Sequence, residues 1–164
     1  MGDKIERKWL AHYIDANFVT SGTGTTNYVR LGQHLESYAE ELNPQVSVQR
    51  NIIGEQTVIH AGYEVSSSVE PYYCYFDEPL FVKLKDIANK RVTGSDCCTT
   101  RVDVLFDESG NTLWAYREKC WVVPNSVGGD TSGMQIPFGV YNDGERTAGT
   151  WAKTGDNWTF TPTT

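Results

Sequence analysis

The sequence predicts a mainly β protein, a β-sandwich or partial barrel with one flanking α-helix. Runs of alternating apolar and polar residues recur along the chain, which is typical of half-buried strands. Fifteen Gly, nine Tyr and five Trp favour strands joined by tight turns. A length of 164 residues suits one domain. We therefore expect residues 1–164 to form a single domain, with a flexible N-terminal arm and loop over about 1–27.

The first expected strand covers 8–14 and places Trp9, Ala11 and Tyr13 on one face. The Ser- and Gly-containing segment 21–26 follows it. This segment has a Gly-x-Gly, but it lacks the Gly-Lys-Ser/Thr and the strand-to-helix context of a phosphate-binding loop. We interpret it as a flexible connector.

Residues 35–69 are predicted to form a large hairpin with an extended tip over about 43–55. Apolar and polar residues alternate approximately over 35–42 and regularly, with a period of two, over 57–69. In the second strand, the side with Ile59, Tyr63 and Val69 is expected to face the core. The other side, with His60 and Glu64, is expected to face water.

One helix is predicted over 77–90. Asp77 is a suitable N-cap, and Pro79 suits the first turn. The apolar residues lie at helical spacing and form one stripe, which is expected to pack on a sheet: Leu80, Phe81, Leu84, Ile87 and Ala88.

The rest of the chain is predicted to be strands joined by turns. Asp143-Gly144 between alternating runs is a strong hairpin signal. The expected strands cover 102–107, 112–123, 134–141, 146–153 and 158–160. About seven strands and one helix result.

The composition excludes several functions. A net charge of −7 argues against a protein that grips nucleic acid or an anionic membrane. No apolar stretch reaches the length of a membrane span, and the charged N-terminus does not resemble a signal peptide, so we expect the chain to stay in a cytosol. The cysteines show no metal-ligand spacing and are expected to be reduced, small and partly buried: Cys74, Cys97, Cys98 and Cys120.

We predict no catalytic, cofactor-binding or metal-binding site. None of the three histidines, His12, His34 and His60, stands in a familiar ligand or triad motif. His60 falls on the water-facing side of its predicted strand. The sequence therefore indicates a protein that is not an enzyme and needs no cofactor.

Acidic residues are distributed unevenly. Between Arg30 and Lys83 the only basic residue is Arg50, while the same stretch carries eight acids. This surface either keeps the protein soluble or repels an anion. The long hairpin also leaves open strand edges, which a neighbouring copy could pair, and a repeated head-to-tail contact can close a ring.

A set of short segments occurs in a defined order along the chain. The most specific is Val-Gly-Gly-Asp-Thr-Ser-Gly at 127–133, which runs into Gln-Ile-Pro-Phe at 135–138. The other segments are 28–32, 42–44, 51–55, 62–64, 69–73, 77–81, 142–146 and 148–150. Together they resemble the tail tube protein (major tail protein) of long-tailed bacteriophages, and the similarity extends from about Lys8 to Thr150.

The resemblance implies a structural protein that forms rings of probably six copies, which stack into a tube for genome delivery. Strands of each subunit would join a barrel around the lumen, and a long loop would reach the next ring. The implied partners are copies of the same chain, other tail proteins at the tube ends, and passing double-stranded DNA that is not bound specifically; no membrane is implied. The implied location is the virion tail, assembled in the cytoplasm of a host bacterium.

Carried onto this sequence, the resemblance suggests two sets of site residues. Which face of 35–42 lines the lumen stays open, because Tyr38 and Leu42 share the face of Glu36. The candidates for facing the lumen are Glu36, Glu40, Glu64, Ser66 and Ser68. The candidates for the ring-stacking loop are Asn43, Pro44, Arg50, Asn51, Gly54 and Glu55.

Two alternatives remain. The same fold could build the inner tube of a contractile phage tail or of a tail-like bacteriocin. A β-sandwich module could instead bind carbohydrate through tryptophans, although aromatic residues on strands are more often core. The tryptophans concerned are Trp114, Trp121, Trp151 and Trp158.

Overall fold

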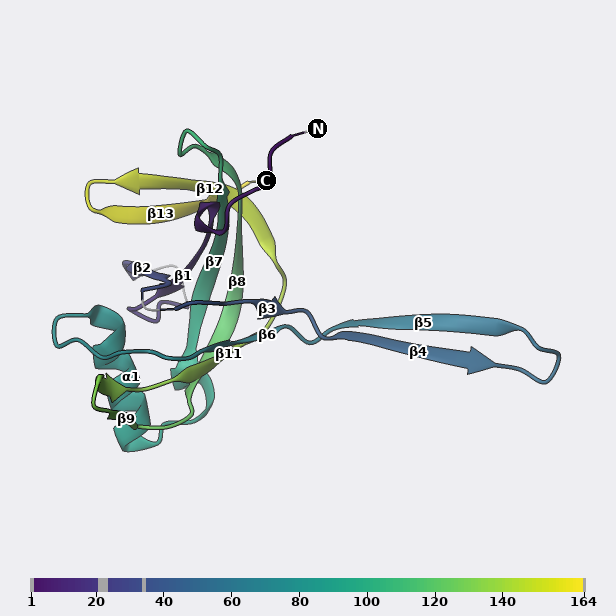
Figure 1. Ribbon diagram of the computed structural model, residues 1–164, viewed down its shortest axis with the longest axis horizontal. Coiled ribbons are helices and arrows are strands. Elements are labelled where there is room, and N and C mark those ends of the chain that lie inside the picture. Colours follow the sequence, from purple (N-terminus) through teal and green to yellow (C-terminus); the bar gives the residue numbers. More distant parts are fainter. Residues whose placement is uncertain (1, 21–23, 34, 164) are drawn as a thin grey trace.

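A nine-stranded sheet forms most of the protein in the computed structural model, which describes residues 2–20, 24–33 and 35–163 (Figure 1). The strands run in the order β2-β1-β7-β8-β11-β6-β3, with β12 paired to β8 and β13 paired to β12. Its strands are β1 (Leu10–Asp15), β2 (Tyr28–Leu31), β3 (Glu40–Glu41), β6 (Ser66–Val69), β7 (Cys98–Phe106), β8 (Thr112–Pro124), β11 (Phe138–Asn142), β12 (Thr147–Thr154) and β13 (Asn157–Pro162).

The remaining elements of the described residues are two two-stranded hairpins, one α-helix and two short 3₁₀ helices. They are β4 (Pro44–Arg50) with β5 (Gln56–Tyr63), β9 (Gly128–Asp130) with β10 (Gly133–Gln135), α1 (Pro79–Lys90), η1 (Arg7–Trp9) and η2 (Gly94–Cys97). The sheet curls, so the predicted mainly β partial barrel with one flanking helix is confirmed.

The helix covers the larger of two hydrophobic cores. Four residues of its predicted stripe, Leu80, Phe81, Leu84 and Ile87, are buried, and the fifth, Ala88, is half-buried. Leu80, Phe81 and Leu84 pack with Val122 of β8, Phe138 of β11 and their neighbours. The N-cap is Glu78, not Asp77. A residue before proline favours an extended backbone, so the helix begins at Pro79, two residues after the predicted start.

The smaller core lies under the β12–β13 hairpin. Trp151 and Trp158 stack with ring centroids 5.5 Å apart, and Tyr13 of β1 lies 4.7 Å from Trp151. Val102 and Val104 of β7 belong to the same core. Residues of β1 alternate between the cores, because Ile14 joins the larger core and Tyr13 the smaller one. Trp9, expected on the Tyr13 face, belongs to η1 instead.

Three predicted strands differ from the structure. The segment 35–42 is strand only at Glu40–Glu41. The segment 134–141 divides into β10 and β11 around Pro137, which has no N–H for a strand ladder. The segment 57–69 divides into β5 and β6, so it is not one long strand with a core face.

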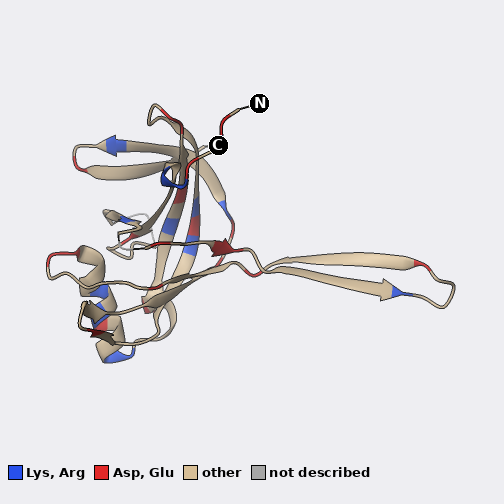
Figure 2. Ribbon diagram, in the orientation of Figure 1, with Lys and Arg blue, Asp and Glu red and all other residues tan. Residues whose placement is uncertain are grey.

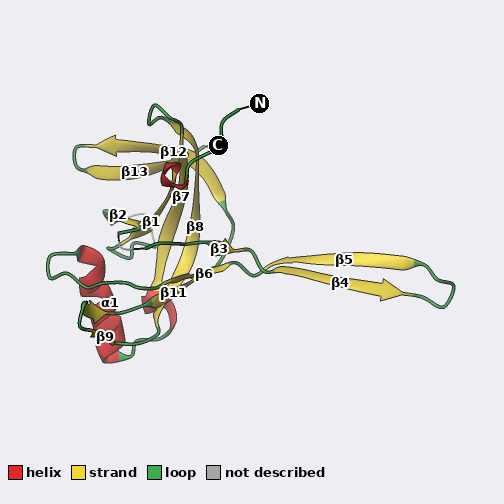
Figure 3. Ribbon diagram, viewed as in Figure 1, coloured by secondary structure: helices red, strands yellow, loops and turns green. Residues whose placement is uncertain are grey.

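The hairpin β4–β5, residues 44–63, is called the arm below. It projects far from the rest of the molecule, called the body, and its two strands pair with each other (Figures 1 and 3). The predicted long hairpin is therefore present. Its loop is shorter than the expected tip of 43–55, because Pro44–Arg50 is strand and only 51–55 connects the strands. Within the described residues, no helix combines the length and apolar character needed to cross a membrane.

Candidate functional site

The arm exposes apolar side chains on both of its faces. Every residue of β4 is exposed, and β5 is exposed except for half-buried Gly62. At the tip, Ile52 is fully exposed and Ile53 is 73% exposed. A lone two-stranded hairpin is only marginally stable in water, and a concentrated exposed apolar surface indicates an interaction site. The arm is therefore the strongest candidate for a functional surface.

Asn51 organises the tip of the arm. Its Oδ1 accepts hydrogen bonds from the backbone N–H of Ile53 (3.2 Å) and of Glu55 (2.9 Å). Its Nδ2 donates to the Glu55 carboxylate at 2.8 Å. Gly54 has a φ of 87°, which glycine adopts without strain. Three of the candidate stacking residues, Asn51, Gly54 and Glu55, thus shape a turn that holds Ile52 and Ile53 outward.

The arm is fixed to the body at Asn43 and Glu64. The Asn43 side chain donates from Nδ2 to the carbonyl of Glu64 at 2.9 Å and to Oγ of Ser66 at 3.2 Å. The backbone N–H of Glu64 donates to the Asn43 carbonyl at 3.3 Å. These bonds bring the two ends of the arm together. Asn43 therefore contributes to the root of the arm, and Pro44 begins β4.

A buried cluster of charged residues lies on the sheet beyond this root. Arg101 is 2% exposed and donates to Oδ1 of Asp103 at 2.9 Å. His12 of β1 donates from Nδ1 to the same oxygen at 2.6 Å. Burial alone would raise the pKa of Asp103, but the His12 hydrogen bond and the Arg101 charge hold it below its usual range. Arg146 adds contacts to Asp103 and to Glu118.

Glu40 connects this cluster to the root of the arm. Its carboxylate accepts a hydrogen bond from Nδ2 of Asn142 at 2.8 Å and lies 3.5 Å from the Arg101 guanidinium. Burial raises the pKa of Glu40 to about 7, and Arg101 opposes that effect. Because β3 immediately precedes the arm, the protonation of Glu40 acts close to the point where the arm leaves the body.

The cluster contains the residue types of a metal site, but an arginine supplies its positive charge. His12, Glu40 and Asp103 offer ligand atoms within 4.8 Å of one another. The Arg101 guanidinium already supplies a positive charge in this space and bonds to Asp103. Its donors satisfy carboxylate oxygens that a metal would need as ligands. We therefore interpret the cluster as a structural ion network that links β1, β3, β7 and β11.

Sequence reasoning missed this network. The available signal was Arg101 and Asp103 two residues apart in a strand, on the face opposite the apolar Val102 and Val104. Such a face is usually interpreted as solvated. The partner His12 lies 91 positions away in sequence, and no local pattern connects it to Asp103.

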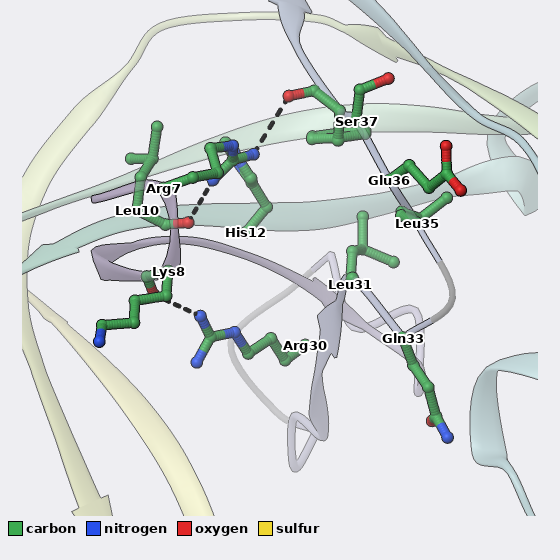
Figure 4. A pocket seen from close by; sticks show the side chains of 12 residues that line it. Arg7, Lys8, Leu10, His12, Arg30, Leu31, Gln33, Leu35, Glu36 and Ser37 are labelled. Atoms are coloured by element: carbon green, nitrogen blue, oxygen red, sulfur yellow. Dashed lines mark hydrogen bonds between the residues drawn. The ribbon is translucent and has the colours of Figure 1, made fainter. Parts of the chain in front are cut away.

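A pocket of about 400 Å³ lies beside His12 and carries basic residues around its mouth (Figure 4). The Arg7 guanidinium donates to the carbonyl of Leu10 at 2.6 Å and to that of Tyr38 at 3.1 Å. The Arg30 guanidinium donates to the carbonyl of Lys8 at 2.8 Å. These hydrogen bonds hold the N-terminal segment against the body. They give the two arginines a structural role, so their presence at one pocket does not require a bound ligand.

The candidate lumen residues differ in exposure. Glu36, Glu64 and Ser68 are exposed, Ser66 is half-buried, and Glu40 lies within the charged cluster. Along the arm, charges occur only near the tip, at Arg50 and Glu55 (Figure 2). The one acid within the arm, Glu55, therefore lies at its tip, and Glu40, Glu41 and Glu64 flank its root.

The cysteines and tryptophans have structural positions. Cys74, Cys97, Cys98 and Cys120 are free, and all but the half-buried Cys74 are buried, in agreement with the prediction. Trp151 is buried in the smaller core, and Trp158 stacks on it. Two of the four tryptophans considered for carbohydrate binding thus serve the core. His60 is exposed, as expected, and His34 lies outside the described residues.

Comparison with known proteins supports the fold. No protein-family model matches the chain, and no curated protein matches it. A solved structure that it resembles is a chain of the anti-feeding prophage cap, described as a tube terminating cap and determined by cryo-EM. The TM-score is 0.52 at 11% sequence identity, and the likeness covers 92% of this chain and 93% of that chain. At this identity the likeness shows a shared fold.

Proposed function

We propose that the protein is a structural subunit of a phage tail or tail-like particle, which assembles with its own copies into stacked rings that form a tube. The observation that carries the proposal is the arm, an extended hairpin whose apolar residues find no cover within the described chain. Its strands also present open hydrogen-bonding edges. A neighbouring copy can cover the apolar residues and pair the edges.

The energetics favour assembly through the arm. Full burial of one Ile or Val side chain contributes roughly 1.5–3 kcal/mol. Five large apolar side chains of the arm are more than half exposed: Ile52 and Ile53 at the tip, and Val46, Val48 and Val58 on the strands. Burying several of them in a contact repeated around a ring gives a favourable free energy even after the cost of association.

The fold shared with a tube terminating cap supports a role in a tail, and it also provides the second candidate function. A cap closes a tube, whereas a tube subunit extends one. The resemblance of segments such as 127–133 to tail tube proteins favours the extending role, with rings of six copies in the tail of a virion assembled in the bacterial cytoplasm. Both candidates make rings of one chain; only the tube subunit polymerises further by itself.

In the proposed tube, the exposed acids at the root of the arm face the passing DNA. Duplex DNA carries a negative charge about every 1.7 Å of its axis. Glu64 and Ser68 offer no cation to its phosphates, whereas Glu36 lies beside the basic residues of the pocket next to His12. Screening limits the repulsion to about 8 Å at physiological salt, which suffices to prevent adhesion. Glu40 contributes little here, because its carboxylate faces Arg101.

Assembly can be tested with the purified chain over a concentration series, by sedimentation and electron microscopy. Rings and tubes are expected for the tube subunit, and single rings for a cap. In a matched variant, residues 46–61 are replaced by Asn-Gly, which closes Gln45 onto Gly62 in a two-residue turn. This variant should stay monomeric with an intact body. A full-length chain that remains monomeric at every concentration would overturn the proposal.

The conduit can be tested in a particle that carries the protein. Glu36→Lys together with Glu64→Lys should leave tubes intact and slow genome delivery, because the new cations bind phosphate. Glu108→Lys changes an exposed acid in the turn between β7 and β8 and serves as the control. Unchanged delivery with the double variant would contradict the assignment of this surface to the lumen.

A further inference from the structure

We infer that the tip of the arm of one copy docks into an apolar groove at the C-terminal end of α1 of another copy. The inference rests on the proposed function and names the receiving surface for the arm. The groove is called the α1 groove below. It lies between the last turn of α1, the segment that follows the helix, and the end of β8.

The α1 groove has the size and chemistry to accept apolar side chains. Its volume is about 420 Å³. Val123 and Val127 are exposed at its edge, at 39% and 52%. Its walls are mainly apolar, with Arg91, Thr93, Asn125 and Ser126 among the lining residues, so filling it removes hydrocarbon surface from water. The residues that provide these walls are Ile87, Val92, Cys97, Trp121, Val123 and Val127.

The tip of the arm presents two exposed apolar side chains that such a groove can bury. Ile52 and Ile53 are adjacent, project from a turn fixed by Asn51, and are the two most exposed of the large apolar residues of the arm. A pre-ordered turn loses little conformational entropy on docking. The turn that carries Ile52 and Ile53 can therefore insert into the α1 groove without changing its conformation.

The charges around the two surfaces are also complementary. The tip is flanked by one cation and one anion, Arg50 and Glu55. The α1 groove is lined by Arg91, the residue that caps the end of α1, and the exposed Asp96 of η2 is the sequence neighbour of the groove residue Cys97. Glu55 can face Arg91 while Arg50 faces Asp96. Such pairs at the edge of an interface fix orientation and discourage other partners.

The arrangement in space requires a second copy. The arm leaves the body on the side away from α1, so the tip cannot reach the groove of its own chain (Figure 1). A contact between unlike surfaces of identical chains is head-to-tail. It generates a closed ring or an open stack when repeated. The same docking thus continues from copy to copy.

Disulfide cross-linking tests the contact in the full chain. Ile53→Cys and Val127→Cys are prepared separately and mixed under assembling conditions, then oxidised, and the linked peptides are identified by mass spectrometry. A link from position 53 to position 127, or to the native Cys97 in the groove wall, is expected as the main product. Leu113→Cys, an exposed position at the other end of β8, replaces Val127→Cys in the control.

The outcomes separate this inference from the proposed function. Assembly with the 53–127 or 53–97 link supports both. Assembly in which position 53 links to Leu113→Cys, to Cys74, or to neither groove position overturns the docking site and leaves the tube function standing. Absence of any assembly by the full-length chain overturns both.

Discussion

The body and the arm use the same residues at the same spacing with opposite results. Val102 and Val104 in β7 are completely buried, whereas Val46 and Val48 in β4 are 53% and 55% exposed. Both pairs lie on one face of a strand. In the body, the β12–β13 hairpin covers that face. In the arm nothing within the described chain does so. The body is therefore expected to fold on its own, and the arm to gain most of its stability from a neighbour.

The buried charged cluster gives the largest expected effect on the body. Asp103→Asn removes the carboxylate that accepts from His12 and Arg101 and leaves the Arg101 guanidinium buried with a weaker partner. Breaking a buried ion pair in this way costs about 3–5 kcal/mol of unfolding free energy. Denaturant unfolding of the dilute monomer measures the loss.

The control for this substitution is Asp130→Asn, at an exposed position in β9, which should change the unfolding free energy by less than about 0.5 kcal/mol. Equal effects of the two substitutions would show that the cluster does not stabilise the body.

The second effect is a dependence on pH. Burial raises the pKa of Glu40 to about 7 from an ordinary value of 4.5, so the folded body favours the protonated form. A raised pKa contributes stability that is complete below pH 4.5 and is lost as pH rises through 7. The unfolding free energy should therefore fall by about 1–3 kcal/mol between pH 5 and pH 8.

Glu40→Gln retains the shape of the side chain without the titration, so most of this slope should disappear in thermal unfolding at the two pH values. The substitution leaves the other charged and titratable groups around position 40 unchanged: Asp103, Arg101, His12, Tyr38 and Glu118. Glu64→Gln, at an exposed position beside the root of the arm, is the control and should keep the wild-type slope. A slope that survives in Glu40→Gln would assign it to other groups, such as Glu78, whose pKa burial also raises.

The smallest effect is expected in the arm. Val48→Ala removes methyl groups that are already in water, so the unfolding free energy of the monomer should change by less than about 0.5 kcal/mol. Val104→Ala, the same change in the larger sheet, should cost about 2 kcal/mol through the cavity that it leaves. A comparable loss in both variants would mean that the arm packs within its own chain in solution.

Much of the body could be predicted from local sequence. The apolar stripe from Leu80 to Ile87 indicates a helix on a sheet, and the strands around 102–107 and 112–123 follow from alternation. The predicted ends of helices and strands were less accurate where a proline determines the backbone conformation. Pro79 delays the start of the helix, and Pro137 interrupts the strand expected over 134–141.

The exposure of the arm could not be predicted, because alternation indicates a strand but not what covers it. Ile59 and Tyr63 have the spacing of a core face, yet both are exposed, at 41% and 58%. The same limit affected the candidate lumen residues. Glu40 was expected on a face with water, but the fold brings it to Arg101, 61 positions later in the chain. Only the tertiary structure supplies such a partner.

The closure of the arm at Asn43 and Glu64 has a consequence for variation among related chains. The hairpin enters and leaves the body at one point, where two backbone positions are already hydrogen-bonded. Its length and side chains can change without moving any strand of the sheet. Recognition between subunits can therefore diverge separately from folding. Hairpins exchanged between two such proteins at these positions should transfer the choice of assembly partner along with them.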